Sequence, residues 1–204
     1  MFFENISRKR KTVILLIFVL VLVFFTGVFY FSQNKEIKGS PDDYVIIETE
    51  QGVFVENERA GLSMKAPNGW EVRKIEVMEG SIVFYSPDAQ GLNPDKIRPP
   101  LQQGCMIEAA MAYKKTSFEE LKEEVEEIHE GFFMQSEEFE EIKISAYESL
   151  KNRFECQLLG YGEAVYIPTN KNLYSFCIYS SIKDTDKEIC SKKLDEFLNH
   201  VVIE

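Results

Sequence analysis

The stretch RKRKTVILLIFVLVLVFFTGVFYF, residues 8–31, decides the architecture of this chain. Its last 20 residues, 12–31, form an apolar run without a single charge. A helix of about 20 apolar residues spans the hydrocarbon core of a bilayer and satisfies its own backbone hydrogen bonds there. Because residues 8–11 are all basic, they favour the cytoplasmic side. The sequence therefore predicts a single-pass protein of the bacterial cell membrane, with a cytoplasmic N-terminus and an extracytoplasmic C-terminal domain.

A cleavable signal peptide is the alternative interpretation of this run. Signal peptides have an apolar region of about 7–15 residues, followed by small residues at the cleavage site. The run here is longer and ends in the bulky residues Phe29, Tyr30 and Phe31. We therefore expect an uncleaved membrane anchor.

The remaining chain divides by composition into a linker and one domain. Residues 1–11 are a basic cytoplasmic tail, 12–31 the transmembrane helix, 32–43 a linker and 44–204 the extracytoplasmic domain. The linker is marked by the helix breaker Gly39-Ser40-Pro41. About 160 residues is the size of one ordinary domain.

The extracytoplasmic part is strongly acidic. The whole chain has a net charge of −11, and residues 1–11 contribute +3, which leaves −14 for the rest. Such a domain repels the phosphates of nucleic acids, which proteins bind through Lys and Arg. We therefore expect no nucleic-acid partner.

The four cysteines, Cys105, Cys156, Cys177 and Cys190, lie in no metal-binding spacing. Outside the cytoplasm they allow two disulfides in three different pairings, between which the sequence does not choose. The alternative is that all four are small buried thiols.

Short β-rich segments separated by turn residues dominate residues 44–113 and 139–181. The turn Pro67-Asn68-Gly69 is the clearest, and 158–162 and 168–172 are further turns. Residues 87–103 form a loop with four of the seven prolines. The predicted strands are 44–47, 52–56, 60–66, 70–78, 81–86, 104–113, 139–145, 147–157, 163–167 and 173–181.

Two amphipathic helices interrupt the strands. Ser117 and Glu120 form a capping box at the start of the first helix. Its apolar stripe is Phe118, Leu121, Val125, Ile128 and Phe132, with His129 on the polar side. Asp184 or Thr185 caps the second helix, whose apolar face is Ile189, Cys190, Leu194, Phe197, Leu198 and Val201. Antiparallel strands with two such helices indicate an α+β fold, an α/β/α sandwich.

The outer domain resembles the PsbP-like family, which is named for an extrinsic subunit of the oxygen-evolving photosystem. GLSMKAPNGW, residues 61–70, resembles the family's opening strand and turn. The helix with Phe118, Leu121 and Val125 resembles its middle helix, residues 147–181 its strand meander, and 197–202 its closing helix. The resemblance covers residues 58–204 and implies a sheet between helices with a non-catalytic binding or assembly role. A transmembrane anchor departs from the family's pattern, and no functional residue is carried over.

Catalytic and cofactor motifs are missing from the sequence. It has two histidines, no G-x-S-x-G serine and no phosphate-binding loop. His129 next to Glu126 and Glu130 is a weak metal candidate that we interpret as a solvated surface residue. His200 is favourably placed near a helix C-terminus and is expected to be structural. We expect neither metal nor cofactor.

These observations favour a non-enzymatic binding or scaffolding protein of the cell envelope. One alternative is an envelope hydrolase with carboxylates of raised pKa in a deep pocket. Another is a pure anchor for a membrane complex. The seven glutamates of residues 119–130 are either a docking face for a basic partner or a solvated helix face. The predicted contact residues are Trp70, Pro94, Pro99, Pro100, Tyr161, Glu123 and Glu127.

Overall fold

The computed structural model describes residues 37–75, 81–91, 101–131, 134–156, 160–181 and 186–204. The chain divides into two units, Met1–Glu36 and Ile37–Glu204, and the second contains all of the described residues. The predicted transmembrane segment, residues 12–31, lies outside the described residues. Within the described ranges, no helix is both long and apolar enough to cross a bilayer.

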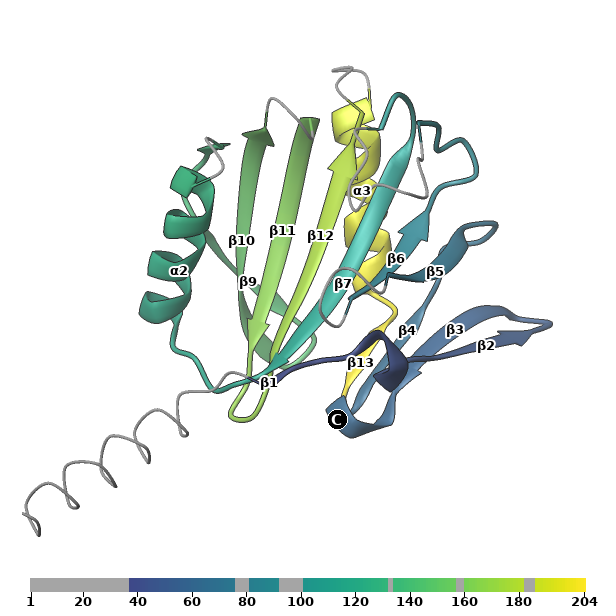
Figure 1. Cartoon of the computed structure of the whole chain (residues 1–204), viewed down its shortest axis with the longest axis horizontal. Helices are drawn as coiled ribbons and strands as arrows, with labels where there is room; N and C mark the ends of the chain where they lie inside the picture. Colours follow the sequence, from purple (N-terminus) through teal and green to yellow (C-terminus); the bar gives the residue numbers. More distant parts are fainter. Residues whose placement is uncertain (1–36, 76–80, 92–100, 132–133, 157–159, 182–185) are drawn as a thin grey trace, which may run out of the picture. The chain divides into compact units, whose positions relative to one another are not determined.

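A large antiparallel sheet of nine described strands organises the Ile37–Glu204 unit (Figure 1). Its spatial order is β5-β6-β7-β12-β11-β10-β8, while β1 pairs with β7 and β9 pairs with β10. The strands are β1 (Ile37–Lys38), β5 (Glu71–Ile75), β6 (Ser81–Tyr85), β7 (Cys105–Tyr113), β8 (Gln135–Ser136), β9 (Glu140–Ile144), β10 (Tyr147–Cys156), β11 (Gly160–Pro168) and β12 (Leu173–Ser180).

A second, smaller sheet contains the chain's last strand. Its order is β13-β4-β3-β2, and its strands are β2 (Val45–Thr49), β3 (Gly52–Asn57), β4 (Leu62–Lys65) and β13 (Val201–Ile203). The prediction that Val201 belongs to the closing helix is wrong, because Val201 pairs with Met64 of β4. Val201, Val202 and Ile203 are consecutive β-branched residues, which favour a strand over a helix.

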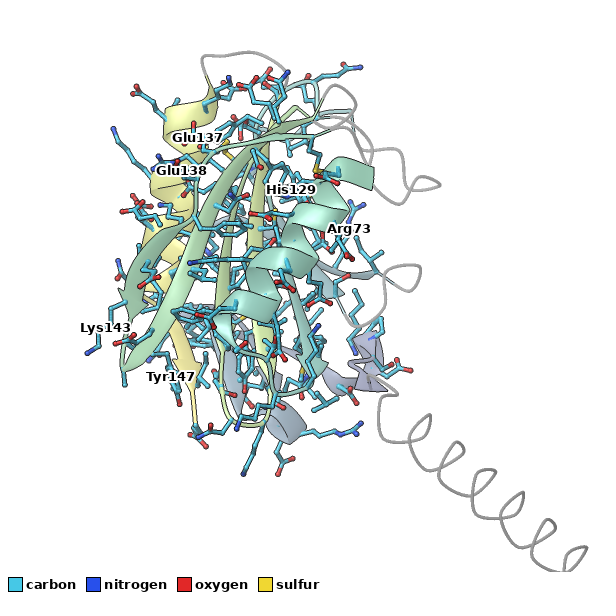
Figure 2. All side chains as sticks on the ribbon, turned by 90° about the vertical axis from the view of Figure 1, so that its left-hand side faces the viewer. Arg73, His129, Glu137, Glu138, Lys143 and Tyr147 are labelled. Carbon is cyan, nitrogen blue, oxygen red and sulfur yellow. A yellow bond between two sulfur atoms is a disulfide. The ribbon has the colours of Figure 1, made fainter. Side chains whose placement is uncertain are left out.

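The two α-helices among the described residues, α2 (Phe118–Gly131) and α3 (Lys187–Leu198), pack on opposite faces of the large sheet. Side chains alternate between the faces of a strand. Ile107 of β7 and Phe176 of β12 share a core with Phe197 of α3. On the other face, Leu150 and Leu173 share a core with Leu121 and Val125 of α2, which runs along the sheet in Figure 2. The predicted α+β class is therefore confirmed for the described residues.

The small sheet lies on the α3 side of the large sheet. Val55, Leu62 and Met64 belong to the same buried core as Leu194 and Phe197 of α3. Apolar side chains of both sheets thus contact α3, and Cys190, Leu194, Phe197 and Leu198 are its buried residues.

The beginning of α2 is as predicted, but its buried face is not. The backbone N–H of Ser117 donates to Glu120 Oε2 at 2.9 Å, and the Glu120 N–H donates to Ser117 Oγ at 3.3 Å. His129, expected on the polar side, is buried, whereas Ile128 is 49% exposed. Spacing of 3–4 residues from Val125 fits both positions, and packing against the sheet selects the histidine.

The buried face of helix α3 also differs from the predicted one. Cys190, Leu194, Phe197 and Leu198 are buried as expected, but Ile189 is 57% exposed. The predicted caps, Asp184 and Thr185, lie outside the described residues. Their neighbour Asp186 precedes the helix and accepts a hydrogen bond from Ser181 Oγ at 2.6 Å.

The folded unit begins at Ile37, inside the segment predicted as a linker. Ile37 pairs with Tyr113 of β7, and Pro41–Asp43 form a short 3-10 helix capped by Ser40. The Ser40 backbone N–H donates to Asp43 at 2.9 Å, so this turn is held by its own capping box. The Gly-Ser-Pro sequence predicted as the helix breaker of a linker thus makes a defined turn.

Gly160 and Gly162, predicted as a turn, belong to strand β11. Gly162 pairs with Phe154 of β10. A Cβ at Gly162 would lie 2.3 Å from the Phe154 ring. The glycine therefore makes room for an aromatic ring above the sheet instead of bending the chain.

A disulfide joins Cys105 of β7 to Cys190 of α3, with Cα atoms 5.6 Å apart. Both residues are buried, and they are separated by 85 positions in the sequence. The bond therefore fixes the last helix onto the middle of the large sheet. It also selects among the pairings that the sequence left open.

We expect the Cys105→Ala/Cys190→Ala variant to lose about 2–4 kcal/mol of unfolding free energy, because the bond closes a long loop in the unfolded chain. Chemical denaturation with and without a thiol reductant measures this. Reductant should destabilise the wild type by more than it destabilises the double variant. Equal sensitivity of both proteins would show that the disulfide does not form.

Candidate functional site

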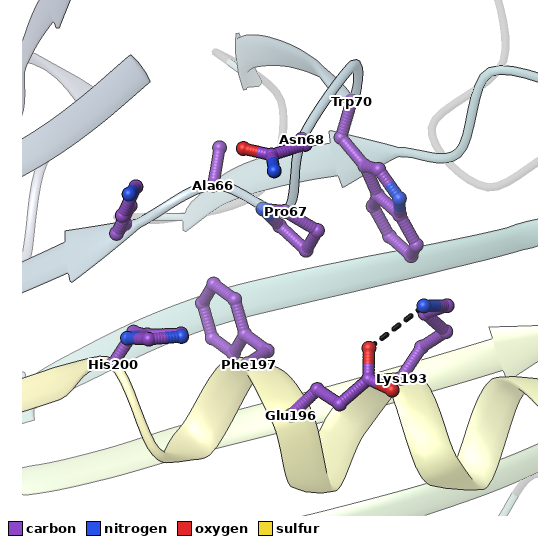
Figure 3. Close-up of a pocket in the computed structure, with 9 residues that line it drawn as sticks. Ala66, Pro67, Asn68, Trp70, Lys193, Glu196, Phe197 and His200 are labelled. Atoms are coloured by element: carbon purple, nitrogen blue, oxygen red, sulfur yellow. Dashed lines mark hydrogen bonds and ion pairs between the residues drawn. The ribbon is translucent and has the colours of Figure 1, made fainter. Parts of the chain in front are cut away.

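A cavity of about 270 Å³ lies between the β4–β5 turn and α3 (Figure 3). One wall is the turn, and the other is the C-terminal half of α3 together with His200, which lies just beyond the end of the helix. The cavity is lined by Lys65, Ala66, Pro67, Asn68, Trp70, Lys193, Glu196, Phe197 and His200.

The turn wall is built by Pro67-Asn68-Gly69. The Trp70 backbone N–H donates to the Pro67 carbonyl at 3.1 Å. Gly69 has φ +79°, which a residue with a side chain rarely adopts, so the turn depends on glycine here. Before the turn, the Ala66 N–H donates to the Val53 carbonyl at 2.9 Å. These bonds hold Trp70 opposite α3 (Figure 3).

The helix wall is fixed by the burial of Phe197. Its ring lies 4.9 Å from that of Phe84 and 6.0 Å from that of Phe176, measured between centroids. Lys193 lies about one turn before Phe197 and Glu196 directly before it, and Lys193 Nζ lies 2.7 Å from Glu196 Oε2. The cavity therefore combines an aromatic floor with a charged rim.

A second cavity, of about 230 Å³, lies beside the small sheet. Its lining is acidic: Glu56, Asn57, Glu58, Gly61, Leu62, Ser63, Val202 and Glu204. No group of three His, Cys, Asp or Glu suited to a metal ion is found among the residues that the structure describes.

A buried carboxylate, Glu163, anchors a polar cluster between β10, β11 and α3. Glu163 Oε1 lies 2.7 Å from Lys151 Nζ. Glu163 Oε2 accepts hydrogen bonds from Arg153 Nε at 3.0 Å, Tyr161 Oη at 3.1 Å and Ser191 Oγ at 2.9 Å. Burial alone raises the pKa of Glu163, but Lys151 and Arg153 outweigh it and hold that pKa below its usual value. The cluster is a satisfied structural network.

His129 is a second polar residue inside the fold. Its ring packs 5.0 Å from that of Phe154, between centroids, and its Nδ1 has no hydrogen-bond partner among the described residues. Burial lowers the pKa of His129 because the protonated ring loses solvation. An imidazole in these surroundings is a neutral core residue, so the predicted solvated surface position is wrong.

The residues predicted as contacts lie in different places. Trp70 is buried and lines the larger cavity, and Tyr161 belongs to the Glu163 cluster. Burial and the neighbouring Glu163 carboxylate raise the pKa of Tyr161. Glu123 and Glu127 are exposed on α2. Pro94, Pro99 and Pro100 lie outside the described residues.

The other cavity residues were missed by sequence reasoning. Lys65 ends an unremarkable strand, and Lys193 lies in a helix with other lysines. The sequence placed His200 near the end of a helix, but it did not show that this residue would lie across the cavity from the β4–β5 turn. The one available signal was the sequence Pro-Asn-Gly-Trp, since a tight turn fixes the position of the tryptophan that follows it.

Stability between pH 8 and pH 5 should depend on His129. Because its pKa is lower in the folded state, the unfolded chain takes up the proton first. Stability therefore falls as the pH drops through the unfolded value, near 6.5. As the pH drops over this range, the unfolding free energy of the His129→Leu variant should fall less than that of the wild type. His200→Gln, the matched control in a chain with two histidines, should behave as the wild type. Equal pH dependence of the wild type and His129→Leu would contradict the prediction.

Comparison by sequence gives no relatives. No protein-family model matches the chain, and no curated protein matches its sequence.

Comparison by structure gives a fold. The solution structure of cyanobacterial PsbP (CyanoP) from Synechocystis sp. PCC 6803 matches with a TM-score of 0.51 and 10% identity, covering 74% of this chain and 91% of that one. A crystal structure from Bacteroides thetaiotaomicron matches at a TM-score of 0.39 and 17% identity, over 71% and 45% of the two chains. A Pseudomonas aeruginosa protein of unknown function matches at 0.42 and 8%, over 79% and 97%. The similarity to CyanoP, together with the antiparallel sheet between two helices, shows that the Ile37–Glu204 unit has a PsbP-like fold.

Proposed function

We propose that this protein is a non-enzymatic binding protein of the cell envelope, anchored by residues 12–31, and that it binds a small ligand in the cavity beside Trp70. The observation that carries the proposal is the composition of that cavity. Four apolar residues, among them Trp70 and Phe197, line it together with five polar or charged ones, so a ligand there would meet both kinds of group. Its volume of about 270 Å³ suits a small ligand.

The cavity is poorly equipped for the hydrolase alternative. That mechanism needs two carboxyl groups, one of them with a raised pKa. Glu196 is the one carboxylate in the lining, and it is ion-paired with Lys193. Elsewhere in the unit, the carboxyl pKa values of Glu71, Glu120 and Glu163 are all displaced downward.

The membrane location is supported by the sequence of residues 8–31 and by the disulfide. Disulfides form and persist in oxidising compartments, outside the bacterial cytoplasm. A buried bond between Cys105 and Cys190 fits a domain that folds after export.

Binding can be followed through Trp70, which is the chain's single tryptophan. The full chain in lipid nanodiscs should show a saturable change in tryptophan emission with phenylacetate or phenylacetamide, because either ring would lie against Trp70. Asn68→Tyr, which places a bulky side chain in the cavity, should abolish the change. Asn170→Tyr, at an exposed position in the 168–172 segment, is the matched control. If neither compound alters the emission, the cavity is not a binding site for small apolar ligands.

A separate experiment tests on which side of the membrane the Ile37–Glu204 unit lies. A protease added to intact cells, or to spheroplasts of a species with an outer membrane, should digest the Ile37–Glu204 unit. An epitope tag at the N-terminus should stay protected until the cells are lysed. Protection of the unit in intact cells, with digestion after lysis, would place the unit in the cytoplasm and overturn the envelope proposal.

A further inference from the structure

Strand β2 forms a free edge of the small sheet. The sheet order β13-β4-β3-β2 gives β2 one strand partner among the described residues, β3, and Figure 1 shows β2 on the outside of the fold. An edge strand presents a row of backbone N–H and C=O groups with which another strand can pair. The hydrogen bonds of β3 show which groups of β2 point outward.

The backbone groups of Ile46 and Glu48 point toward this free edge. The Val53 carbonyl accepts a hydrogen bond from the N–H of the residue that follows β4, so Val53 directs its backbone groups toward β4. Because the direction alternates along a strand, Phe54 directs its groups toward β2, where it pairs with Ile47. The neighbours of Ile47 in the sequence, Ile46 and Glu48, therefore direct theirs away from β3.

The side chains of β2 leave its edge accessible. Val45 is 57% exposed, and Ile46 and Ile47 are half-buried. Lysine, proline or a very short strand commonly protects an edge from pairing. Strand β2 has five residues with neither lysine nor proline, whereas β13 has three residues and β5 carries Arg73 and Lys74. Strand β2 is thus open to a further strand.

The surroundings of this edge are acidic. Residues 41–58 contain six carboxylates and no basic residue. The carboxylates are Asp42, Asp43, Glu48, Glu50, Glu56 and Glu58. All except Asp43 are exposed and have no ion-pair partner in the part of the chain that the structure describes. Lys65 lies over the Phe54 ring from β4, which β3 separates from β2. Like charges repel, so this edge favours a basic strand over a second copy of itself.

An added strand meets different surroundings on its two faces. Ile46 packs toward the core, so Val45 and Ile47 face outward, beside Phe54. Side chains opposite Val45 and Ile47 extend this apolar patch. On the other face, a side chain opposite Glu48 meets an exposed carboxylate. Because successive side chains of a strand point to opposite faces, the segment that fits alternates apolar and basic residues.

We propose that β2 binds an extended segment of a partner protein as an additional antiparallel strand, and that this segment alternates apolar and basic residues. Its backbone pairs with Ile46 and Glu48, its apolar side chains lie beside Val45 and Ile47, and its basic side chains meet Glu48 and the neighbouring carboxylates. In this mode of recognition, main-chain hydrogen bonds give affinity and alternate side chains give specificity. The Trp70 cavity has no part in this interaction, so the two binding proposals are tested independently.

The probe is a fluorescent, end-capped peptide of alternating valine and lysine. The full chain is titrated into it in nanodiscs of zwitterionic lipid, which gives the cationic peptide no anionic lipid to bind, and anisotropy measures binding. We expect saturable binding. A peptide with the same composition, but with its valines and lysines in two blocks, should bind more weakly, because it does not separate charge and apolar surface onto two faces.

Methylation of the peptide nitrogens separates backbone pairing from charge. In the proposed register the lysines lie opposite Ile46 and Glu48, so the lysine N–H groups pair with β2 and the valine N–H groups point away. Methylating the lysine backbone nitrogens should weaken binding about tenfold, since several backbone hydrogen bonds are lost. Methylating the valine nitrogens should leave the affinity nearly unchanged. An equal loss with both peptides would overturn the proposed pairing.

Glu48→Pro is the matched change in the protein. An edge strand tolerates proline where the N–H points outward, so chemical unfolding should resemble that of the wild type while peptide binding is lost. Glu48→Gln keeps the N–H and should weaken binding about threefold, as expected for one cross-strand charge pair. Glu127→Gln, on the acidic face of α2, should have no effect. Binding that survives Glu48→Pro, or a wild type that does not bind the alternating peptide, would overturn the proposal.

Discussion

Phe197 connects the core of the Ile37–Glu204 unit with the Trp70 cavity. It lies on α3, packs against Phe84 and Phe176 of the large sheet, and forms the floor of the Trp70 cavity. Aromatic pairs of this kind contribute beyond the area that they bury. Because the same ring holds the helix and lines the cavity, the geometry of the cavity depends on the packing of the core. The disulfide at Cys190 holds the helix at a second point, two turns earlier.

Much of the fold could be predicted from local patterns. The capping box at Ser117, the turn at Pro67-Asn68-Gly69 and the α+β class follow from short-range chemistry, and the structure confirms them. The predictions were wrong where two neighbouring residues fit the local pattern equally well and long-range packing determined which of them is buried. Ile128 and His129 are both placed to continue the stripe from Val125, and the sheet buries His129. Ile37 pairs with a strand more than 70 residues away, which no local pattern indicates.

The candidate site could be predicted only in part. Trp70 was among the predicted contact residues, and it does line the larger of the two described cavities. Lys65, Lys193 and His200 come to the same cavity because β4 and α3 pack together through the core. Their sequence positions carry no sign of this proximity. Similarity to CyanoP at 10% identity fixes the arrangement of sheet and helices and does not transfer a ligand.

Strand β13 has a consequence for the order of folding. It pairs with β4, whose residues lie more than 130 positions earlier in the chain, and the Glu204 N–H that follows it donates to the Gly61 carbonyl at 2.9 Å. β13 forms one border of the smaller sheet. Until β13 reaches β4, that strand presents unpaired backbone groups at an open edge. The smaller sheet is therefore vulnerable to pairing with another molecule for as long as the segment after α3 has not docked.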